Sequence, residues 1–310
     1  MTRYVTRRAL LSFGALAIAS LIIFYGLRIS PSSPENTLFL PNASPAAKQE
    51  LRDRLGLDDP IPVQYWNFLE DLVHGDFGTS IKSGQPIGQT IVDYGLRTAE
   101  LVAAAALLTY LLAIPLGIIA AANRNRWPDH LISGFASVAL GVPNFLLALL
   151  LILLFASTLG WLPVAGTGGI QFLILPAITL AAEGLAVTLR LMRTSMLEEL
   201  GKDYVRALRA KGLRKRTIVW RRAARNALLP LISYGGLYFG ALIGYTAIVE
   251  TIFRWPGLGQ LLVSSVLQRD YPVALWSSLV LTTTVIVANF IANIAYAYAD
   301  PRIRLAEERG

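Results

Sequence analysis

Hydrophobic residues along this 310-residue chain gather into six long stretches that polar segments separate. The stretches predict membrane spans over residues 9–27, 99–122, 131–157, 172–191, 227–250 and 274–299. Each holds about 20 residues or more, which is enough for a helix to cross ~30 Å of hydrocarbon. The pattern therefore predicts an all-α integral membrane protein with six transmembrane helices.

The first apolar stretch has a competing interpretation as a signal peptide. Arg3, Arg7 and Arg8 precede it, and a charged start before an apolar region is typical of such a peptide. The apolar region of a signal peptide is usually only about 7–15 residues long, which is shorter than this stretch. We therefore expect a first transmembrane helix, with residues 1–8 in the cytosol.

The polar segments predict the orientation of the chain in the membrane. Acids outnumber bases in segment 28–98, which is assigned to the outside together with loops 158–171 and 251–273. Segments 123–130, 192–226 and 300–310 are assigned to the cytosol, because basic loops stay on that side. An even number of spans then places both termini in the cytosol.

Short motifs in the external segment and in two spans predict local irregularity. Residues 45–57 predict a short amphipathic helix, and a second is indicated by Val63, Trp66, Leu69 and Val73. Turns are predicted at Gly75, Gly78 and Gly84. Inside the spans, Pro115 predicts a kink in the second, while Gly141 and Pro143 interrupt the third.

The net charge of +8 is concentrated in one cytosolic segment. Eleven basic and three acidic residues lie between positions 193 and 225, and the rest of the chain is balanced. Only 15% of all residues are charged, against about 25% in soluble domains. Because the basic run is tethered between two spans, it favours a topology signal combined with partner docking and not nucleic-acid binding. The chain has no cysteine, which excludes disulfide and thiolate chemistry.

Residues 203–230 predict two helices separated by a glycine. The first is indicated by the helical spacing of Leu200, Tyr204, Ala207, Leu208 and Lys211. Gly212 is expected to end it in the left-handed conformation. The second is expected to place Ile218, Val219, Ala223 and Ala227 on one side. Together they predict a rigid knob on the cytosolic face.

The chain lacks the motifs of a self-sufficient enzyme. It contains neither a Gly-x-x-x-x-Gly-Lys-Ser/Thr phosphate loop nor a His-Glu-x-x-His metal motif. Its two histidines, His74 and His130, are predicted on opposite sides of the membrane, where they cannot share a zinc site or a catalytic triad. We therefore expect no enzymatic activity, cofactor or metal in this chain.

Two ionisable residues in the fourth span are candidate pathway residues. Glu183 lies deepest, and Arg190 follows seven positions later on the same helix face. Such groups either line a polar pathway or form structural hydrogen bonds between helices, and both interpretations stay open. Two other polar residues of the spans, Asn289 and Asn293, are expected to form contacts between helices. Glu100 and Glu250, near the outer ends of their spans, are expected to have no special role.

The cytosolic segment resembles the coupling-loop motif of ABC importer permeases. The resemblance rests on residues 203–213 (DYVRALRAKGL) and 225–230 (RNALLP). Among ABC importer permeases, the chain most resembles the first permease subunit of the dipeptide/oligopeptide/nickel family. Further hallmarks of that family are residues 55–60 (LGLDDP), 75–80 (GDFGTS), 159–163 (LGWLP), 255–259 (WPGLG), 269–272 (RDYP) and 300–304 (DPRIR). Arg222 and Asn293 depart from the family pattern, since many relatives have histidine and aspartate there.

The resemblance implies a subunit of a larger transporter in the cell membrane. Two such permeases pair around a pathway, and each docks on a cytosolic ATPase subunit. The transporter has one or two such ABC ATPase subunits, which bind ATP and magnesium. A substrate-binding protein delivers the cargo from outside. Dipeptides and oligopeptides are the expected cargo, and other members of the family carry glutathione, metal chelates or haem.

The resemblance also implies roles for ten residues of the loop. Tyr204, Ala207 and Leu208 are expected to fill a groove on the ATPase. Gly212 is expected to set the bend. Polar contacts at the rim of the groove are expected from Asp203, Arg206 and Lys211, and the motif is completed by Leu213, Asn226 and Pro230.

Two other classes of function compete with an ABC permease. A stand-alone secondary transporter or channel would use Glu183 as its ion-coupling group, and internal repeats would favour it. The sequence shows kinking prolines but no convincing repeat. A membrane scaffold that only anchors a partner would explain the cytosolic knob but not the other motifs.

Overall fold

The computed structural model describes residues 2–28, 49 and 58–299. Within them the regular elements are helices, apart from one isolated bridge between Thr79 and Pro86. The helices are α1 (Thr2–Arg28), α4 (Ile61–His74), α5 (Ile87–Ala122), α6 (Trp127–Gly141), α7 (Asn144–Leu151), η1 (Ile152–Thr158), α8 (Ile170–Gly201), α9 (Asp203–Ala210), α10 (Lys215–Thr217), η2 (Ile218–Ala223), α11 (Ala224–Ala227), α12 (Leu229–Phe253), α13 (Leu258–Gln268) and α14 (Tyr271–Ala299). The helix predicted over 45–57 and the tail 300–310 lie outside the described residues.

Among the described residues, five helices are long and apolar enough to cross a membrane: α1, α5, α8, α12 and α14. A sixth candidate span consists of α6 together with α7 and η1, which are bent by 106° relative to each other. The bend falls between Gly141 and Pro143, where the sequence predicts an interruption of the third span. Proline has no N–H to donate to the preceding turn, so the helix ends there. The six-helix prediction is consistent with this arrangement, and the cytosolic location of both termini stays a prediction.

Several helices continue beyond the spans predicted from hydropathy. Helix α5 begins at Ile87, within the predicted external segment 28–98. Helix α8 runs to Gly201, within the predicted cytosolic loop 192–226, and α13 occupies much of the predicted loop 251–273. Hydropathy detects only the apolar part of a helix, whereas backbone hydrogen bonding continues through polar turns.

Helix α4 forms where the sequence predicts it but buries a different face. Its buried residues are Gln64 and Phe68, whereas Trp66 and Val73 are 69% and 83% exposed. Phe68 belongs to an aromatic cluster with Phe24 of α1 and Trp276 of α14. The turns predicted at three glycines are confirmed, since positive φ angles are found at Gly75 (72°), Gly78 (67°) and Gly84 (69°).

Small residues allow the helices of the core to approach closely. Gly117 of α5 leaves no room for a side chain beside Met192 of α8, and Gly236 of α12 lies directly against Ala292 of α14. Gly240 lies against the amide of Asn289, which supports the interhelical role expected for that asparagine. Close backbone contact increases van der Waals attraction, the main source of helix association in a membrane.

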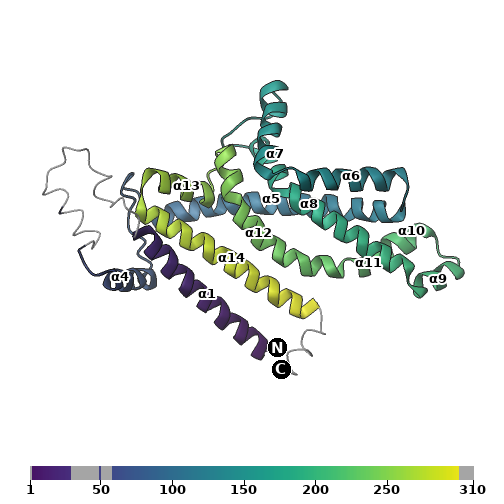
Figure 1. Cartoon of the computed structure of the whole chain (residues 1–310), viewed down its shortest axis with the longest axis horizontal. Helices are drawn as coiled ribbons and strands as arrows, with labels where there is room; N and C mark the ends of the chain where they lie inside the picture. Colours follow the sequence, from purple (N-terminus) through teal and green to yellow (C-terminus); the bar gives the residue numbers. More distant parts are fainter. Residues whose placement is uncertain (1, 29–48, 50–57, 300–310) are drawn as a thin grey trace.

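The two ends of the molecule carry different short helices. Figure 1 shows α4 and α13 at one end and α9 with α10 at the other. Helices α1 and α14 run side by side, and the hydroxyl of Tyr4 donates a hydrogen bond to the carbonyl of Asn293 at 3.3 Å. Under the predicted topology, the α9 end is cytosolic and the α13 end is external.

Candidate functional site

Helix α9 is a short element that defined caps hold in place. Asp203 lies in its first turn, where a negative charge suits the helix dipole. At the other end, Gly212 adopts φ +77°. Its N–H donates to the carbonyl of Arg209 at 2.9 Å, and the N–H of Leu213 donates to the carbonyl of Leu208 at 3.2 Å. These two bonds form a Schellman motif, which confirms that the glycine ends the helix.

Glu199, at the end of α8, connects that helix to α9 and α11 of the predicted knob. Its buried carboxylate accepts hydrogen bonds from the hydroxyl of Tyr204 on α9 at 2.8 Å and from the amide of Asn226 on α11 at 3.3 Å. It also forms an ion pair with Lys202. The sequence prediction did not include Glu199, although its spacing of three residues from Lys202 is typical of a helical ion pair.

The same carboxylate contributes to the raised pKa of two neighbouring groups. Burial and the hydrogen bond to Glu199 raise the pKa of the Tyr204 phenol. The hydrogen bond to Glu199 raises the pKa of the Lys202 ammonium. Both shifts favour a neutral phenol on Tyr204 and a charged ammonium on Lys202, which are the forms that donate to Glu199.

The second half of the knob packs against the body of the protein as the sequence predicts. Ile218, Val219, Ala223 and Ala227 are all buried. Val219, Ala223 and Ala227 belong to a cluster with Ile118 of α5 and Met192 and Met196 of α8. The π-helical segment η2, which the sequence did not predict, directs Arg221 and Arg222 away from this cluster.

A hollow of about 570 Å³ lies between α9 and the η2–α11 segment. It is lined by Tyr204, Ala207, Leu208, Lys211, Arg221, Arg222, Arg225 and Asn226. Four members of the predicted helical stripe line it: Tyr204, Ala207, Leu208 and Lys211. Leu200, the fifth, packs against the cluster of Met192 and Met196 instead. Val205, which is fully buried, attaches α9 to the rest of the knob.

The other predicted loop residues lie outside this hollow. Gly212 and Leu213 form the C-terminal cap of α9. Asp203 and Arg206 form an exposed ion pair at 3.1 Å, and such a pair contributes little stability. Pro230 lies in the first turn of α12, a position that proline tolerates.

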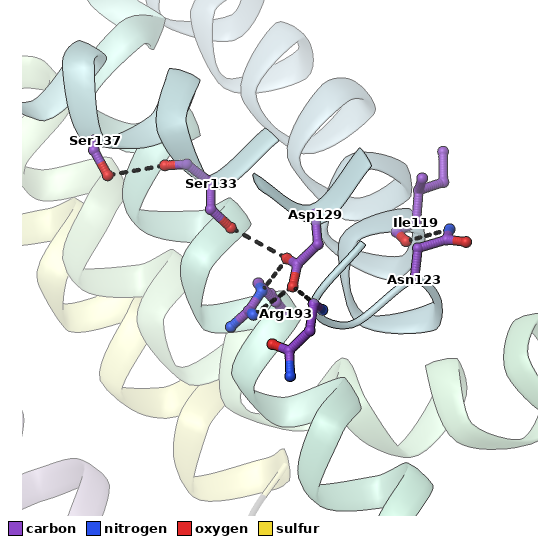
Figure 2. A network of polar contacts seen from close by, with 7 residues as sticks. Ile119, Asn123, Asp129, Ser133, Ser137 and Arg193 are labelled. Carbon is purple, nitrogen blue, oxygen red and sulfur yellow. Dashed lines mark hydrogen bonds and ion pairs between the residues drawn. The ribbon is translucent and has the colours of Figure 1, made fainter. Parts of the chain in front are cut away.

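A buried ion pair that the sequence analysis missed joins α6 to α8. Figure 2 shows the carboxylate of Asp129 between the guanidinium of Arg193 and the hydroxyl of Ser133. Arg193 donates from Nε at 2.6 Å and from a terminal nitrogen at 2.8 Å, and the N–H of Asn125 donates at 2.9 Å. Asp129 is 2% exposed. The pair holds the turn between α5 and α6 against α8.

The two candidate pathway residues do not form a pair. Arg190 is exposed and donates a hydrogen bond to the hydroxyl of Ser137 on α6 at 2.7 Å. Glu183 is half-buried, and in the described part of the chain no hydrogen bond or ion pair joins it to Arg190. For Arg190 the structure supplies the interhelical hydrogen bond of the structural interpretation. A pathway role for Glu183 stays a prediction.

The expectation that Glu250 has no special role was wrong. Its side chain is 0% exposed and accepts hydrogen bonds from Thr98 Oγ1 at 2.7 Å and from the backbone N–H groups of Gly259 at 2.8 Å and Gln260 at 3.1 Å. These N–H groups belong to the first turn of α13, where a helix has unpaired donors. Gly257 leaves no room for a side chain beside this carboxylate. Glu250 therefore connects α12 to both α5 and α13.

A second buried carboxylate lies at the same end of the molecule. Asp270 accepts hydrogen bonds from the hydroxyl of Ser80 at 2.5 Å and from the N–H groups of Ile81 at 3.3 Å and Lys82 at 3.4 Å. It joins the segment before α14 to the segment before α5. Residues 75–80 and 269–272, which the sequence analysis named separately, are thus in direct contact.

Comparisons with known proteins agree on the type of protein. The binding-protein-dependent transport system inner membrane component family matches residues 113–305, and the N-terminal family of such membrane components matches residues 1–102. The glutathione transport system permease protein GsiC of Salmonella typhimurium is 38% identical over 304 residues, which cover 98% of this chain and 99% of that protein. GsiC of Escherichia coli (strain K12) matches with the same identity and coverage.

A solved structure shows that the fold is shared as well. The inward-facing MetNI methionine ABC transporter aligns with a TM-score of 0.60 and 17% sequence identity, over 70% of this chain and 99% of the matched chain. The family matches together span nearly the whole sequence. The chain therefore belongs to the binding-protein-dependent transport system inner membrane components and is a multi-pass permease subunit of an ABC importer in the cell membrane.

Proposed function

We propose that this permease carries small peptides, with glutathione as the first candidate cargo. The observation that supports this cargo most directly is 38% identity to glutathione permeases along nearly the full length of both chains. Glutathione is a peptide-like molecule, so the proposal also fits the resemblance to dipeptide and oligopeptide permeases. The pathway is formed together with a second, homologous permease, and an external binding protein delivers the cargo.

The α9 surface is proposed to receive the motion of cytosolic ATPase subunits. Those subunits bind ATP and magnesium, and the proposal requires no cofactor or metal in this chain. Tyr204, Ala207 and Leu208 contact the ATPase, while Asp203, Arg206 and Lys211 make polar contacts around them. The geometry supports this role, because α9 follows α8 directly and Glu199 ties both helices together.

The motion then passes through α8 to the transmembrane helices. Asp129 and Arg193 connect α8 to α6, and Gly117 sets the close contact between α8 and α5. A displacement of α9 is therefore expected to move these helices as one rigid body, as in other switching proteins. This movement would open the pathway alternately to the two sides of the membrane.

Uptake into proteoliposomes tests the proposed cargo. The permease pair, its ATPases and its binding protein are reconstituted, and ATP-dependent uptake of labelled glutathione is measured with unlabelled dipeptide, oligopeptide, metal chelate or haem as competitor. We expect saturable glutathione uptake in which short peptides compete best. Uptake of a metal chelate or haem that glutathione does not inhibit would contradict the peptide assignment. Uptake without ATP would instead support a stand-alone transporter that uses Glu183.

A further inference from the structure

We propose that the hollow between α9 and the η2–α11 segment binds a carboxylate side chain of the partner ATPase. The inference rests on the proposed coupling role of α9 and specifies the chemistry of that contact. Besides the apolar groove contact expected for α9, it assigns an ionic contact to a part of the loop that the resemblance leaves without a role. An aspartate or glutamate on the ATPase is the occupant.

The hollow carries four positive charges and no negative one. Its cations are Lys211 at the C-terminal cap of α9, Arg221 and Arg222 on η2, and Arg225 on α11. All four side chains are exposed, and across the described residues none of them forms an ion pair. Two of the nearby acids are already paired: Glu199 with Lys202, and Asp203 with Arg206. The cations therefore repel one another until an anion enters.

The other lining groups fit a protein carboxylate. Arginine binds a carboxylate through two parallel hydrogen bonds, and three arginines surround this space. Asn226 adds an amide donor, while Ala207 and Leu208 provide apolar wall for the methylene groups of an acidic side chain. A volume of about 570 Å³ accommodates such a side chain with its neighbours.

The position of the hollow favours a protein partner over a lipid headgroup. Figure 1 shows α9 at the extreme end of the molecule, beyond the end of α14. The side of the knob that packs on the membrane-spanning helices is the opposite one, which carries Val219, Ala223 and Ala227. An acid on a subunit that docks against α9 therefore reaches the cations directly.

Charge reversal in the hollow tests the proposal. Permease complexes carrying Arg222→Glu with Arg225→Glu are placed in nanodiscs of zwitterionic phosphatidylcholine, and the Kd for the cognate ATPase subunits is measured at several salt concentrations. The matched control is Arg209→Glu with Arg216→Glu, which changes the loop charge equally with residues that do not line the hollow. We expect at least a tenfold rise in Kd and a flatter salt dependence for the hollow variant, and less than a threefold rise for the control.

Further measurements separate the alternatives. Arg222→Gln with Arg225→Gln removes charge without adding repulsion and is expected to raise Kd by a smaller factor. Replacing the ATPase aspartate or glutamate that enters the hollow with lysine is expected to restore binding to the charge-reversed permease. Equal effects of the hollow and control variants would overturn the proposal. So would a loss of binding seen only in nanodiscs that contain anionic phosphatidylglycerol, because the hollow would then hold lipid.

The same titration distinguishes this inference from the proposed function. If the unmodified permease complex binds no ABC ATPase, the coupling role of α9 itself is wrong. If it binds the ATPase and the hollow variants bind equally well, only the carboxylate contact is wrong. Thermal unfolding of each variant complex identifies any variant that has lost its fold, and the glutamine pair then replaces it in the comparison.

Discussion

Three buried carboxylates connect parts of the chain that are far apart in sequence, and a fourth connects neighbouring helices. Asp129 and Arg193 are 64 positions apart, Thr98 and Glu250 are 152 apart, and Ser80 and Asp270 are 190 apart. Glu199 connects α8, α9 and α11 over shorter separations. A buried carboxylate requires such partners, because the interior does not replace its hydration otherwise. A single sequence shows the acids but not which distant groups complete them, so these connections were not predictable.

The Asp129–Arg193 pair is expected to stabilise the permease. Asp129→Asn removes the negative charge and leaves a partly buried guanidinium without its partner. Because Arg193 is 27% exposed, water offsets part of the loss, and we expect destabilisation by about 1–3 kcal/mol. The measurement is thermal unfolding of the purified permease. Glu100→Gln, which breaks an exposed ion pair with Arg97, serves as the control and should change stability by less than about 0.5 kcal/mol. Equal shifts for both variants would contradict this assignment.

Glu250 is expected to hold α13 in place through the first turn of that helix. In Glu250→Gln, one of the two acceptor oxygens becomes an NH₂ group that faces N–H donors or the Thr98 hydroxyl. We expect hydrogen exchange in the peptide covering residues 257–268 to become about tenfold faster, since its amides lose acceptors. Mass spectrometry measures this rate, and exchange in α9 is the internal reference. An unchanged rate in residues 257–268 would show that α13 does not depend on Glu250.

At the scale of elements, local signals were predictable and element lengths were not. Helical spacing and Gly212 predict α9 and its end, because a C-terminal cap depends on neighbouring residues alone. The last turns of α8 carry Met192 and Met196, which pack against Val219 and Ala223 of η2, and periodicity does not detect such contacts between segments. The buried face of α4 depends on contacts with Phe24 and Trp276 from other helices. Helical spacing alone indicated Trp66 and Val73, which the structure leaves exposed.

Gly212 is expected to be required for coupling but not for membrane insertion. Gly212→Val places a β-branched residue at φ +77°, which strains the cap and shifts α9 away from its position. We expect ATP-driven uptake to fall at least tenfold while the amount of protein in the membrane stays unchanged. The matched control is Gly201→Val at the end of α8, where there is equal space and no positive φ. Normal uptake in Gly212→Val would contradict the role of this cap.

At the scale of the whole molecule, α12 connects the two functional ends. It begins next to α11 in the cytosolic knob, and its last turns carry Glu250, which holds α13 at the other end. The six-span architecture and the family were predictable, because hydropathy, charge and motif order are local properties of the sequence. The cargo and the group that binds in the hollow were not predictable, because both depend on contacts with other molecules.

The central claim is that this permease works only when ATPases drive it through α9. Proteoliposomes with the complete set of subunits are compared with ones that lack the ATPases or contain this chain alone, and initial glutathione uptake is measured with ATP and with a non-hydrolysable analogue. We predict uptake only in the complete set with ATP. Uptake by this chain alone, or uptake that continues with the analogue at the same rate, would contradict the account.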